Sequence, residues 1–199
     1  MPELSVTTVP ITVETDVDRE TAARYYRLYR QTFGALETRA VARQLLHEDE
    51  FMEEMHDPRV HKYVAWDEDG EAIGMSTLTT DLETVPWISP AYFAHHYPEH
   101  TARRAVYYLG FTLVHPHRRQ SRIFRAMVER IVELLVAERA VCAWDMCAYN
   151  DEMLGLNTNI ERILHGCADV TVAPIDRQTY FASTFHGPVS DPRQQEGQR

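Results

Sequence analysis

The spacing of apolar residues along the chain predicts alternating strands and helices. Residues 4–14 favour an edge strand, where Pro10 is tolerated because an edge leaves some backbone donors unpaired. Residues 18–33 and about 37–56 carry apolar side chains at helical spacing, so we expect two helices there. Asp18 is the expected N-cap of the first helix.

The middle of the chain predicts a hairpin followed by an irregular insertion. Residues 60–66 and 71–80 are rich in β-branched and apolar side chains and flank the turn Asp-Glu-Asp-Gly, which is a strong hairpin signal. Residues 81–104 contain several prolines and aromatic side chains without a regular period. Long loops in compact domains are usually functional or disordered, and the aromatic content argues against disorder. We therefore interpret 81–104 as an inserted aromatic lid over an acceptor.

The C-terminal half continues the pattern of strands and helices. An apolar, β-branched run at 105–114 indicates a buried strand. The pattern as a whole predicts an α/β fold in one domain over residues 1–186, with a polar, disordered tail over 187–199. The further expected elements are a helix at about 120–139, a strand at 141–149, a helix at about 151–164, and two short strands at 169–173 and 178–185.

Composition narrows the classes of function. Of 199 residues, 44% are hydrophobic and 25% are charged, which is enough for a sizeable core. The formal net charge of −10 argues against a nucleic-acid-binding surface, which is normally basic. The sequence contains no run of about 18 apolar residues, so no membrane span is predicted. The N-terminus does not resemble a secretory signal. Three cysteines without CxxC spacing favour a reducing cytoplasm over disulfides or a zinc site.

One local run reverses this acidic balance. Three arginines lie between His115 and Arg122, where the strand near 105–114 gives way to a helix, and Arg125 lies just beyond. Unpaired backbone N–H groups and the helix dipole make the start of a helix a site for anions. Arginines oppose the dipole there unless an anion is bound. We therefore expect a phosphate or diphosphate ligand; the alternative is that the arginines are solvated and pair with carboxylates.

The same junction resembles a known family. Val114-His115-Pro116, followed by Arg119-Gln120-Ser121-Arg122-Ile123-Phe124, is similar to the acetyl-CoA signature of the GNAT N-acetyltransferase superfamily, which is V-x-P and then R/Q-x-x-G-x-G/A at a helix start. The order of expected elements resembles that family over about residues 4–185. The resemblance implies a mixed, mostly antiparallel sheet of about seven strands with flanking helices, in which the two central parallel strands splay apart.

The resemblance also implies a donor site for acetyl-CoA or another acyl-CoA. Backbone groups of the strand would hold the pantetheine arm, and the arginine-rich helix start would surround the diphosphate. The residues implied in this chain are Leu113, Val114, Arg119, Gln120, Ser121, Arg122, Ile123, Phe124, Arg125 and Asn150.

Two departures from the family pattern change the expected chemistry. Arg122 and Phe124 replace loop glycines that let the backbone approach a diphosphate. No tyrosine occurs between Asn150 and Gln178, so the general acid that many members carry on the fourth helix is missing. Protonation of the leaving thiolate therefore needs another residue, or the thiolate leaves without help.

The candidate catalytic residues lie on the strands beside the junction. Tyr108 occupies the position where the family often has a glutamate or histidine, and period-two alternation predicts that it shares a face with Gly110 and Thr112. A phenol with a pKa of about 10 is a usable acid, so Tyr108 is the alternative source of the thiolate's proton. Asp145 is the candidate base on the next strand, expected to share a face with Tyr149. A packing role for Tyr108 and an ion-pair role for Asp145 are the alternatives.

The insertion supplies the candidate acceptor-binding residues. Its histidines lack acidic or cysteine partners at a ligand spacing, so no metal site is predicted. The main hypothesis is transfer of an acyl group, typically acetyl, from a CoA thioester to an amine of a small molecule or peptide. The alternatives are a donor on the phosphopantetheine arm of an acyl carrier protein, and a non-catalytic CoA- or anion-binding domain. The candidate acceptor-binding residues are Trp87, Tyr92, Phe93, His95 and His96.

Overall fold

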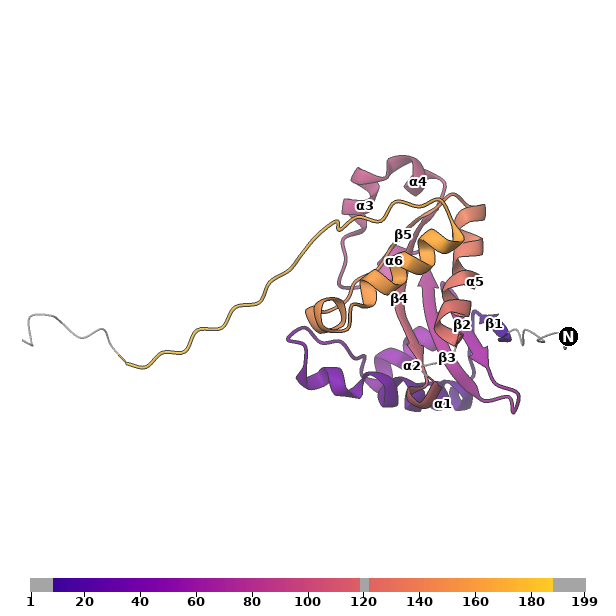
Figure 1. The fold of residues 1–199 in the computed structure, drawn as a ribbon, viewed down its shortest axis with the longest axis horizontal. Helices are drawn as coiled ribbons and strands as arrows, with labels where there is room; N and C mark the ends of the chain where they lie inside the picture. Colours follow the sequence, from indigo (N-terminus) through magenta and orange to yellow (C-terminus); the bar gives the residue numbers. More distant parts are fainter. Residues whose placement is uncertain (1–8, 119–121, 188–199) are drawn as a thin grey trace, which may run out of the picture.

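The structure is a computed structural model that describes residues 9–118 and 122–187 (Figure 1). Its centre is a sheet with the strand order β1-β2-β3-β4-β5. The first four strands run antiparallel to their neighbours, and β5 runs parallel to β4. The strands are β1 (Ile11–Glu14), β2 (Val60–Trp66), β3 (Ala72–Thr79), β4 (Val106–Val114) and β5 (Val141–Ala143).

Helices cover both faces of this sheet. α1 and α2 pack on one face, α5 packs on the other, and α6 lies against α5. The insertion between β3 and β4 forms α3 and α4 at one end of the sheet (Figure 1). The helices are α1 (Arg19–Phe33), α2 (Glu48–His56), α3 (Pro90–His96), α4 (Pro98–Ala102), α5 (Ile123–Ala137) and α6 (Leu156–Cys167), with short turns η1 (Gly34–Thr38), η2 (Leu82–Thr84), η3 (Pro116–Arg118) and η4 (Tyr149–Met153).

The face under α1 and α2 holds an aromatic core. The ring of Tyr29 on α1 lies 5.0 Å from that of Phe51 on α2 and 5.1 Å from that of Phe111 on β4, centroid to centroid. Tilted ring pairs of this kind stabilise a core beyond the area that they bury. On the other face, α5 packs through Ile123 and Met127. The central strands are therefore held between two apolar layers.

Two local predictions are confirmed. Asp18 caps α1, since its carboxylate accepts hydrogen bonds from the backbone N–H groups of Glu20 and Thr21 at 2.9 and 3.1 Å. The hairpin β2–β3 forms around the turn from Asp67 to Gly70, and Gly70 has a φ of +77°. This left-handed conformation is one that glycine adopts without a steric cost.

The prediction of a helix over 37–56 is wrong for the first half of that range. Only Glu48–His56 is α-helical. Before it, the Tyr29 hydroxyl accepts a hydrogen bond from the Leu46 N–H at 3.0 Å and donates one to the Gln44 carbonyl at 3.5 Å. A side chain thus takes the place of helical hydrogen bonds here, and the apolar residues reach the core from an irregular segment.

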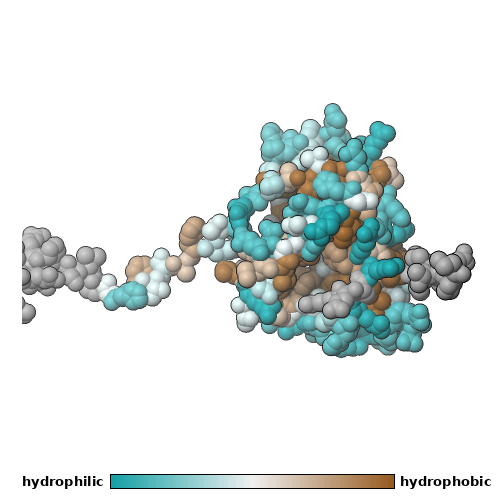
Figure 2. Space-filling model, in the orientation of Figure 1, coloured by the Kyte–Doolittle hydropathy of each residue, from teal (hydrophilic) through white to brown (hydrophobic). Residues whose placement is uncertain are grey.

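The sheet has five strands in the described residues, not about seven. Residues 169–173 and 178–185, expected as strands, are extended but unpaired. In Figure 1 the chain after α6 first passes α3, where the Tyr92 hydroxyl donates to the Ile175 carbonyl, and then leaves the body of the molecule. Figure 2 shows the departing part as a thin string. Phe181 and Phe185 are 93% and 91% exposed. A three-residue β5 offers a partner strand few ladder hydrogen bonds, which explains why the alternating pattern alone does not form a strand. Residues 188–199 of the expected tail lie outside the described residues.

The strand expected over 141–149 and the helix expected at about 151–164 are also corrected. β5 ends at Ala143, and Tyr149 opens the π-helical turn η4. Asp145 and Tyr149 therefore do not share a strand face. Gly155, with a φ of +59°, separates η4 from α6. Among the described helices, none is long and apolar enough to cross a bilayer.

A β-bulge in β4 sets the geometry of the sheet. Ser76 pairs with Thr112 and Leu78 pairs with Leu109, so two β4 residues, Gly110 and Phe111, lie opposite Thr77 alone. A bulge bends its strand and increases the local twist. It also resets the alternation of side chains, since both Phe111 and Leu113 pack toward α1 and α2. Thr112 consequently points to the opposite face from Gly110. The expected shared face is therefore wrong for Thr112, whereas Tyr108 and Gly110 line the same pocket.

The bulge requires glycine at position 110. A Cβ atom there would lie 2.5 Å from the Thr77 hydroxyl oxygen, and the Thr77 side chain is buried and β-branched. We predict that Gly110→Ala lowers the free energy of unfolding by about 1–3 kcal/mol, measured by urea denaturation. Removing the hydroxyl in Gly110→Ala/Thr77→Ala should recover part of this loss, as coupled neighbours do.

Gly166→Ala is the matched control for this prediction. Gly166 lies in α6 with no atom within 4 Å of its added Cβ, and alanine is the better helix former. The bulge account is contradicted if Gly110→Ala is no more destabilising than this control.

Candidate active site

β5 ends just before the bulge, so the rest of β4 has no described partner strand on that side. β5 accompanies β4 only along Val106–Tyr108, and from Leu109 to Val114 no described strand lies on that side of β4. β4 therefore has an open edge where the resemblance implies a splay, but β5 is a short edge strand and not a central one. The open stretch of β4 offers backbone donors and acceptors to an extended ligand.

A polar cluster lies where the two strands separate. The Tyr108 hydroxyl donates a hydrogen bond to the Asp145 carboxylate, and the Trp87 indole N–H lies 3.3 Å from the Tyr108 oxygen and 3.2 Å from Asp145. Tyr108 comes from β4, Asp145 follows β5, and Trp87 comes from the insertion. The structure thus brings together both candidate catalytic residues and one candidate acceptor-binding residue. We call these three residues the Tyr108 cluster.

The electrostatics of Tyr108 bear on its chemistry. Its side chain is 3% exposed. Burial raises the pKa of the Tyr108 phenol well above its usual range, and the hydrogen bond to the Asp145 carboxylate raises it further. The phenol therefore stays protonated at neutral pH and gives up its proton reluctantly. A hydrogen-bonding role fits this environment better than the role of an acid.

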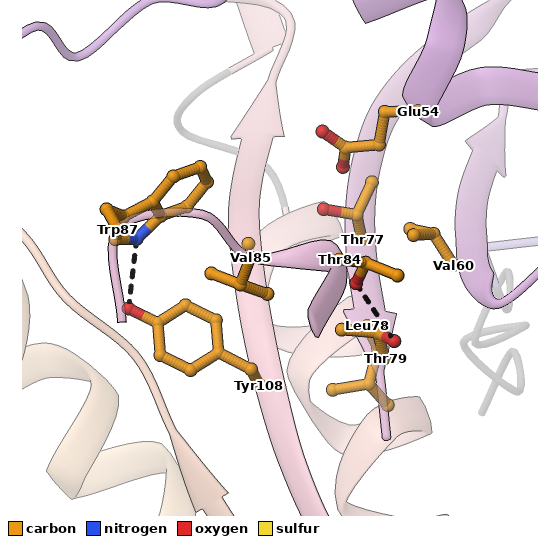
Figure 3. A pocket seen from close by; sticks show the side chains of 10 residues that line it. Glu54, Val60, Thr77, Leu78, Thr79, Thr84, Val85, Trp87 and Tyr108 are labelled. Atoms are coloured by element: carbon orange, nitrogen blue, oxygen red, sulfur yellow. Dashed lines mark hydrogen bonds between the residues drawn. The ribbon is translucent and has the colours of Figure 1, made fainter. Parts of the chain in front are cut away.

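A small pocket adjoins this cluster on the side of α2. Glu54 on α2 and Thr77 on β3 line one side of it, and Trp87 and Tyr108 line the other (Figure 3). Gly110 forms part of the wall between them. The pocket has a volume of about 20 Å³, which is room for about one water molecule.

The polar groups on the Glu54 side are poorly satisfied. The Thr77 side chain is 1% exposed, and its hydroxyl makes no hydrogen bond of normal geometry to any described residue. Glu54 Oε1 and the Thr77 hydroxyl both lie near the vacant Cβ position of Gly110, at 3.7 and 2.5 Å from it. Burial raises the pKa of the Glu54 carboxyl, and the nearby Thr77 hydroxyl offsets part of that rise. Groups of this kind cluster at functional sites.

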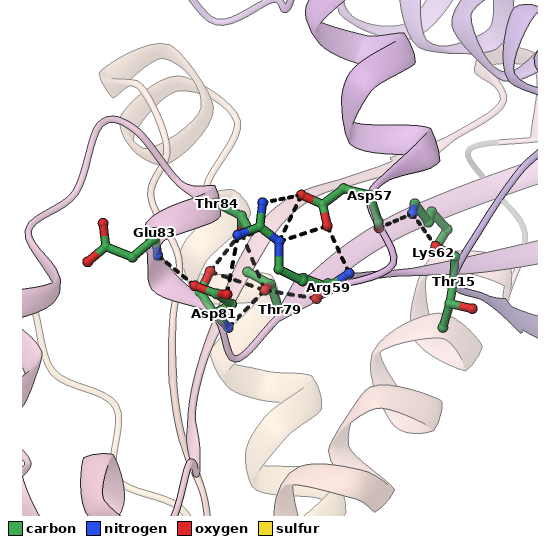
Figure 4. A network of polar contacts seen from close by, with 8 residues as sticks. All are labelled: Thr15, Asp57, Arg59, Lys62, Thr79, Asp81, Glu83 and Thr84. Carbon is green, nitrogen blue, oxygen red and sulfur yellow. Dashed lines mark hydrogen bonds and ion pairs between the residues drawn. The ribbon is translucent and has the colours of Figure 1, made fainter.

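A hydrogen-bond network anchors the segment that carries Trp87 (Figure 4). The Thr79 hydroxyl donates to the Arg59 carbonyl at 3.0 Å and accepts from the Asp81 N–H at 3.0 Å. The Arg59 guanidinium bridges the carboxylates of Asp57 and Asp81. The Thr84 hydroxyl donates a hydrogen bond to the Asp81 carbonyl at 2.8 Å, which closes the turn between them. The first residues of the insertion are thereby tied to the ends of β2 and β3, which fixes the approach of Trp87 to the pocket.

Lys62 secures the other end of this network. Its side chain is fully buried, and its ammonium donates to the carbonyls of Thr15 and Asp57 at 2.9 and 2.7 Å (Figure 4). Burial lowers the pKa of Lys62, and the carboxylate of Glu54 opposes this shift. Lys62 thus joins the loop after β1 to the turn between α2 and β2, which supports the helix that carries Glu54.

The other candidate acceptor-binding residues do not gather around the pocket. Phe93 is 4% exposed and packs in the core between the insertion and β4. The Tyr92 hydroxyl donates to the Ile175 carbonyl at 3.3 Å. His95 and His96 are exposed on α3. Only Trp87 of the five predicted residues lines the pocket. Within residues 9–118 and 122–187, no three His, Cys, Asp or Glu side chains form a group able to hold a metal.

The candidate donor residues on β4 and α5 have different surroundings. Leu113 and Val114 are buried in the cores on opposite faces of the sheet, so only their backbones are available to a ligand. Ile123 is buried and Phe124 packs beside it. The Arg125 guanidinium pairs with Glu129 at 2.6 Å. Asn150 lies in η4, Arg122 is exposed, and the remaining three residues, Arg119, Gln120 and Ser121, lie outside the described residues.

Sequence reasoning missed Glu54 and Thr77. Glu53 and Glu54 are adjacent on an acidic helix. The residue types alone do not tell which carboxylate faces solvent and which faces a strand. The useful signal was the apolar stripe of α2, because Phe51 and Met55 flank Glu54 at helical spacing on the buried side. Thr77 is inconspicuous in a strand, since threonine is common there.

Comparisons with known proteins support the fold. No protein-family model and no curated protein sequence matches the chain, but solved structures do. A tetramutant of the Bacillus halodurans protein BH1408 is 13% identical with a TM-score of 0.53, over 87% of this chain and 99% of that one. An aminoglycoside 6'-N-acetyltransferase from Acinetobacter haemolyticus is 14% identical with a TM-score of 0.51, over 88% and 99%. The chain has the fold of the GNAT N-acetyltransferases, and the resemblance seen in the sequence is confirmed at that level.

The Tyr108 cluster also stabilises the fold. We predict that Tyr108→Phe lowers the free energy of unfolding by about 1–2 kcal/mol, because it removes a hydrogen bond to a charged acceptor. Urea denaturation measures the change. Tyr107→Phe is the matched control, since the neighbouring Tyr107 is also buried but its hydroxyl has no hydrogen bond in the described structure. Equal effects of the two substitutions would contradict the hydrogen-bond account.

Proposed function

We propose that this protein transfers an acyl group, typically acetyl, from a CoA thioester to an amine of a small molecule or peptide. The observation that carries the proposal is the Tyr108 cluster, which lies where β4 loses its β5 partner. The fold is shared with an enzyme that acetylates an aminoglycoside amine. A reacting amine can approach from the pocket side while the donor lies along the open edge of β4. We assign the activity to one domain over residues 1–186, acting in the cytoplasm.

The described residues fit an acyl-CoA. The edge of β4 from Leu109 to Val114 can bind an extended pantetheine arm through backbone hydrogen bonds, as a strand edge binds a peptide. When bound, the acyl-CoA supplies the acyl group as a thioester. Arg122 and Arg125 are exposed near the start of α5, and we assign them, with Arg119, to the donor's phosphates. Arg125 has to exchange its Glu129 partner to do so.

The missing helix tyrosine leaves two sources for the thiolate's proton. The raised pKa of Tyr108 disfavours donation by that residue. We propose that the thiolate leaves without a protein acid, and that Tyr108 and Asp145 orient Trp87 at the mouth of the pocket. No observation favours a donor on a carrier protein, so free acyl-CoA is the proposed donor.

The direct test is turnover with acyl-CoAs against a panel of primary amines. Mass spectrometry of the acylated amine is the suitable readout, because Cys167 is exposed and free and would react with a thiol reagent. Amine-dependent product with at least one acyl-CoA supports the proposal. Stabilisation by CoA, seen as a higher melting temperature, without product from any acyl-CoA would favour the non-catalytic binding domain.

The donor assignment predicts a loss of affinity. Replacing both Arg119 and Arg122 with alanine should weaken CoA binding by about tenfold or more, because two charge-assisted contacts to phosphate are lost. Isothermal titration calorimetry measures the affinity. Arg130→Ala is the control, since Arg130 lies on the exposed side of α5 and pairs with Glu133. Unchanged CoA affinity in the double variant contradicts the assignment.

The role proposed for Tyr108 predicts a small kinetic effect. Tyr108→Phe should keep turnover within a few-fold and preserve the basic limb of the pH–rate profile. A general acid would instead contribute about 10²–10⁴-fold. Steady-state kinetics over a range of pH distinguishes the two cases. A loss in the larger range, with the basic limb flattened, would identify Tyr108 as the acid after all.

A further inference from the structure

We propose that the pocket beside the β4 bulge binds the primary ammonium group of the acceptor, and that Glu54 is the base that removes its proton. This inference rests on the proposed function, and it names the acceptor class and a catalytic residue that the sequence did not indicate. The pocket lies between Glu54 and Thr77 on one side and Trp87 and Tyr108 on the other (Figure 3).

The size of the pocket suits one small head group. Its volume of about 20 Å³ holds about one water molecule, and an ammonium group occupies a similar space. Gly110 creates this room, because any side chain at that position would enter the space beside the Thr77 hydroxyl. A quaternary ammonium or a branched head group would be too large.

The lining favours a cation that donates hydrogen bonds. Glu54 offers a carboxylate, and Thr77 offers a buried hydroxyl that lies beside it without a hydrogen bond of normal geometry in the described structure. An ammonium group has three donors and no acceptor, so it can satisfy both oxygens. The rings of Trp87 and Tyr108 add aromatic faces, which attract cations. No lysine or arginine lines the pocket, so an anionic head group finds no partner there.

The pocket lies close to the edge assigned to the donor. Gly110 in its wall is two residues from Tyr108, after which β4 has no β5 partner. Two residues of strand span about 7 Å. An amine at Glu54 therefore lies beside the same stretch of β4 as the proposed donor, and the reaction requires the acyl carbon to come into contact with that amine.

The amine nitrogen loses two protons during acyl transfer. The ammonium gives one proton to the Glu54 carboxylate and becomes a neutral amine. The nitrogen lone pair forms the amide bond to the acyl carbon, and the carbon–sulfur bond breaks with its electron pair leaving on sulfur as the CoA thiolate. The nitrogen loses its second proton to solvent, and Glu54 later releases its own, so the carboxylate is restored.

The surroundings of Glu54 favour a stronger base than a solvent-exposed carboxylate. Burial raises the pKa of the Glu54 carboxyl, the Thr77 hydroxyl and the Lys62 ammonium lower it in part, and the Asp57 carboxylate raises it. These groups lie on β3, on β2 and in the turn after α2. A carboxyl with a raised pKa is a stronger base once it is ionised.

The same shift predicts how Glu54→Gln affects stability. The pKa of Glu54 is higher in the folded protein than in the unfolded chain. The stability that the protonated carboxyl contributes is therefore fully present below the unfolded-state pKa, and it is lost as the pH rises through the folded-state pKa. At neutral pH, glutamine therefore removes a cost. We expect the melting temperature of Glu54→Gln to equal or exceed that of the wild type, so that lost activity cannot be attributed to unfolding.

The binding experiment needs no donor. In protein with ¹³C-labelled threonine methyl groups, ethylammonium chloride should shift the Thr77 methyl signal with a saturable dependence on concentration, and tetramethylammonium should not. The shift should be lost in Glu54→Gln and kept in Glu53→Gln, since Glu53 is the exposed neighbour on α2. A Thr77 methyl signal that does not shift with ethylammonium would mean that the pocket holds only water, and would overturn the proposed ammonium site.

The kinetic experiment tests the base. Glu54→Gln should reduce kcat/KM for the amine by about 10²–10⁴-fold and remove the acidic limb of the pH profile, with the KM for acyl-CoA unchanged. Thr77→Val should raise the KM for the amine more than it lowers kcat, while the exposed Thr80→Val should have no effect.

The two proposals fail in different ways. Wild-type turnover that survives in Glu54→Gln within a few-fold overturns the role of Glu54 and leaves the acyltransferase function standing. A wild type that acylates no amine overturns the function and, with it, the base role. The ammonium site is then judged by the threonine methyl signal alone.

Discussion

The close approach of the Thr77 hydroxyl to the backbone of Gly110 is the contact on which the site depends. It allows β4 to carry one extra residue opposite β3, and the resulting bulge bends β4 at the point where its pairing with β5 has just ended. The same missing side chain leaves the pocket empty on the side of Glu54. The end of β5 thus opens an edge for a donor, and Gly110 leaves a space for an acceptor beside the same strand.

The surrounding structure compensates for poorly satisfied groups in this pocket. A buried hydroxyl without a hydrogen bond of normal geometry and a desolvated carboxyl both cost folding free energy. The aromatic core under α1 and α2 holds α2 against the sheet. Phe51 on α2 is part of this core. The network around Thr79 and Arg59 fixes the opposite wall through the insertion. Polar groups that ligands could satisfy are therefore kept in place by rigid neighbours.

Much of the fold was predictable because its signals are local. The cap at Asp18, the turn at Gly70 and the apolar run of β4 each depend on a few adjacent residues. The errors arise where a distant group decides the outcome. Tyr29 replaces helical hydrogen bonds before α2, and a short β5 leaves the segment around Phe181 unpaired. Tyr108 was chosen from the family resemblance and Asp145 from the expected strand, and neither choice indicated the hydrogen bond between them. Glu54 faces Thr77 beside a bulge that no alternation pattern reveals.

The most direct test of this account is a crystal structure with desulfo-acetyl-CoA and ethylammonium bound together. The account predicts the pantetheine arm along β4 beyond Tyr108, and the ammonium nitrogen within hydrogen-bond distance of both Glu54 and the Thr77 hydroxyl. An ammonium bound at another surface, or a pantetheine arm that does not follow the open edge of β4, would contradict it.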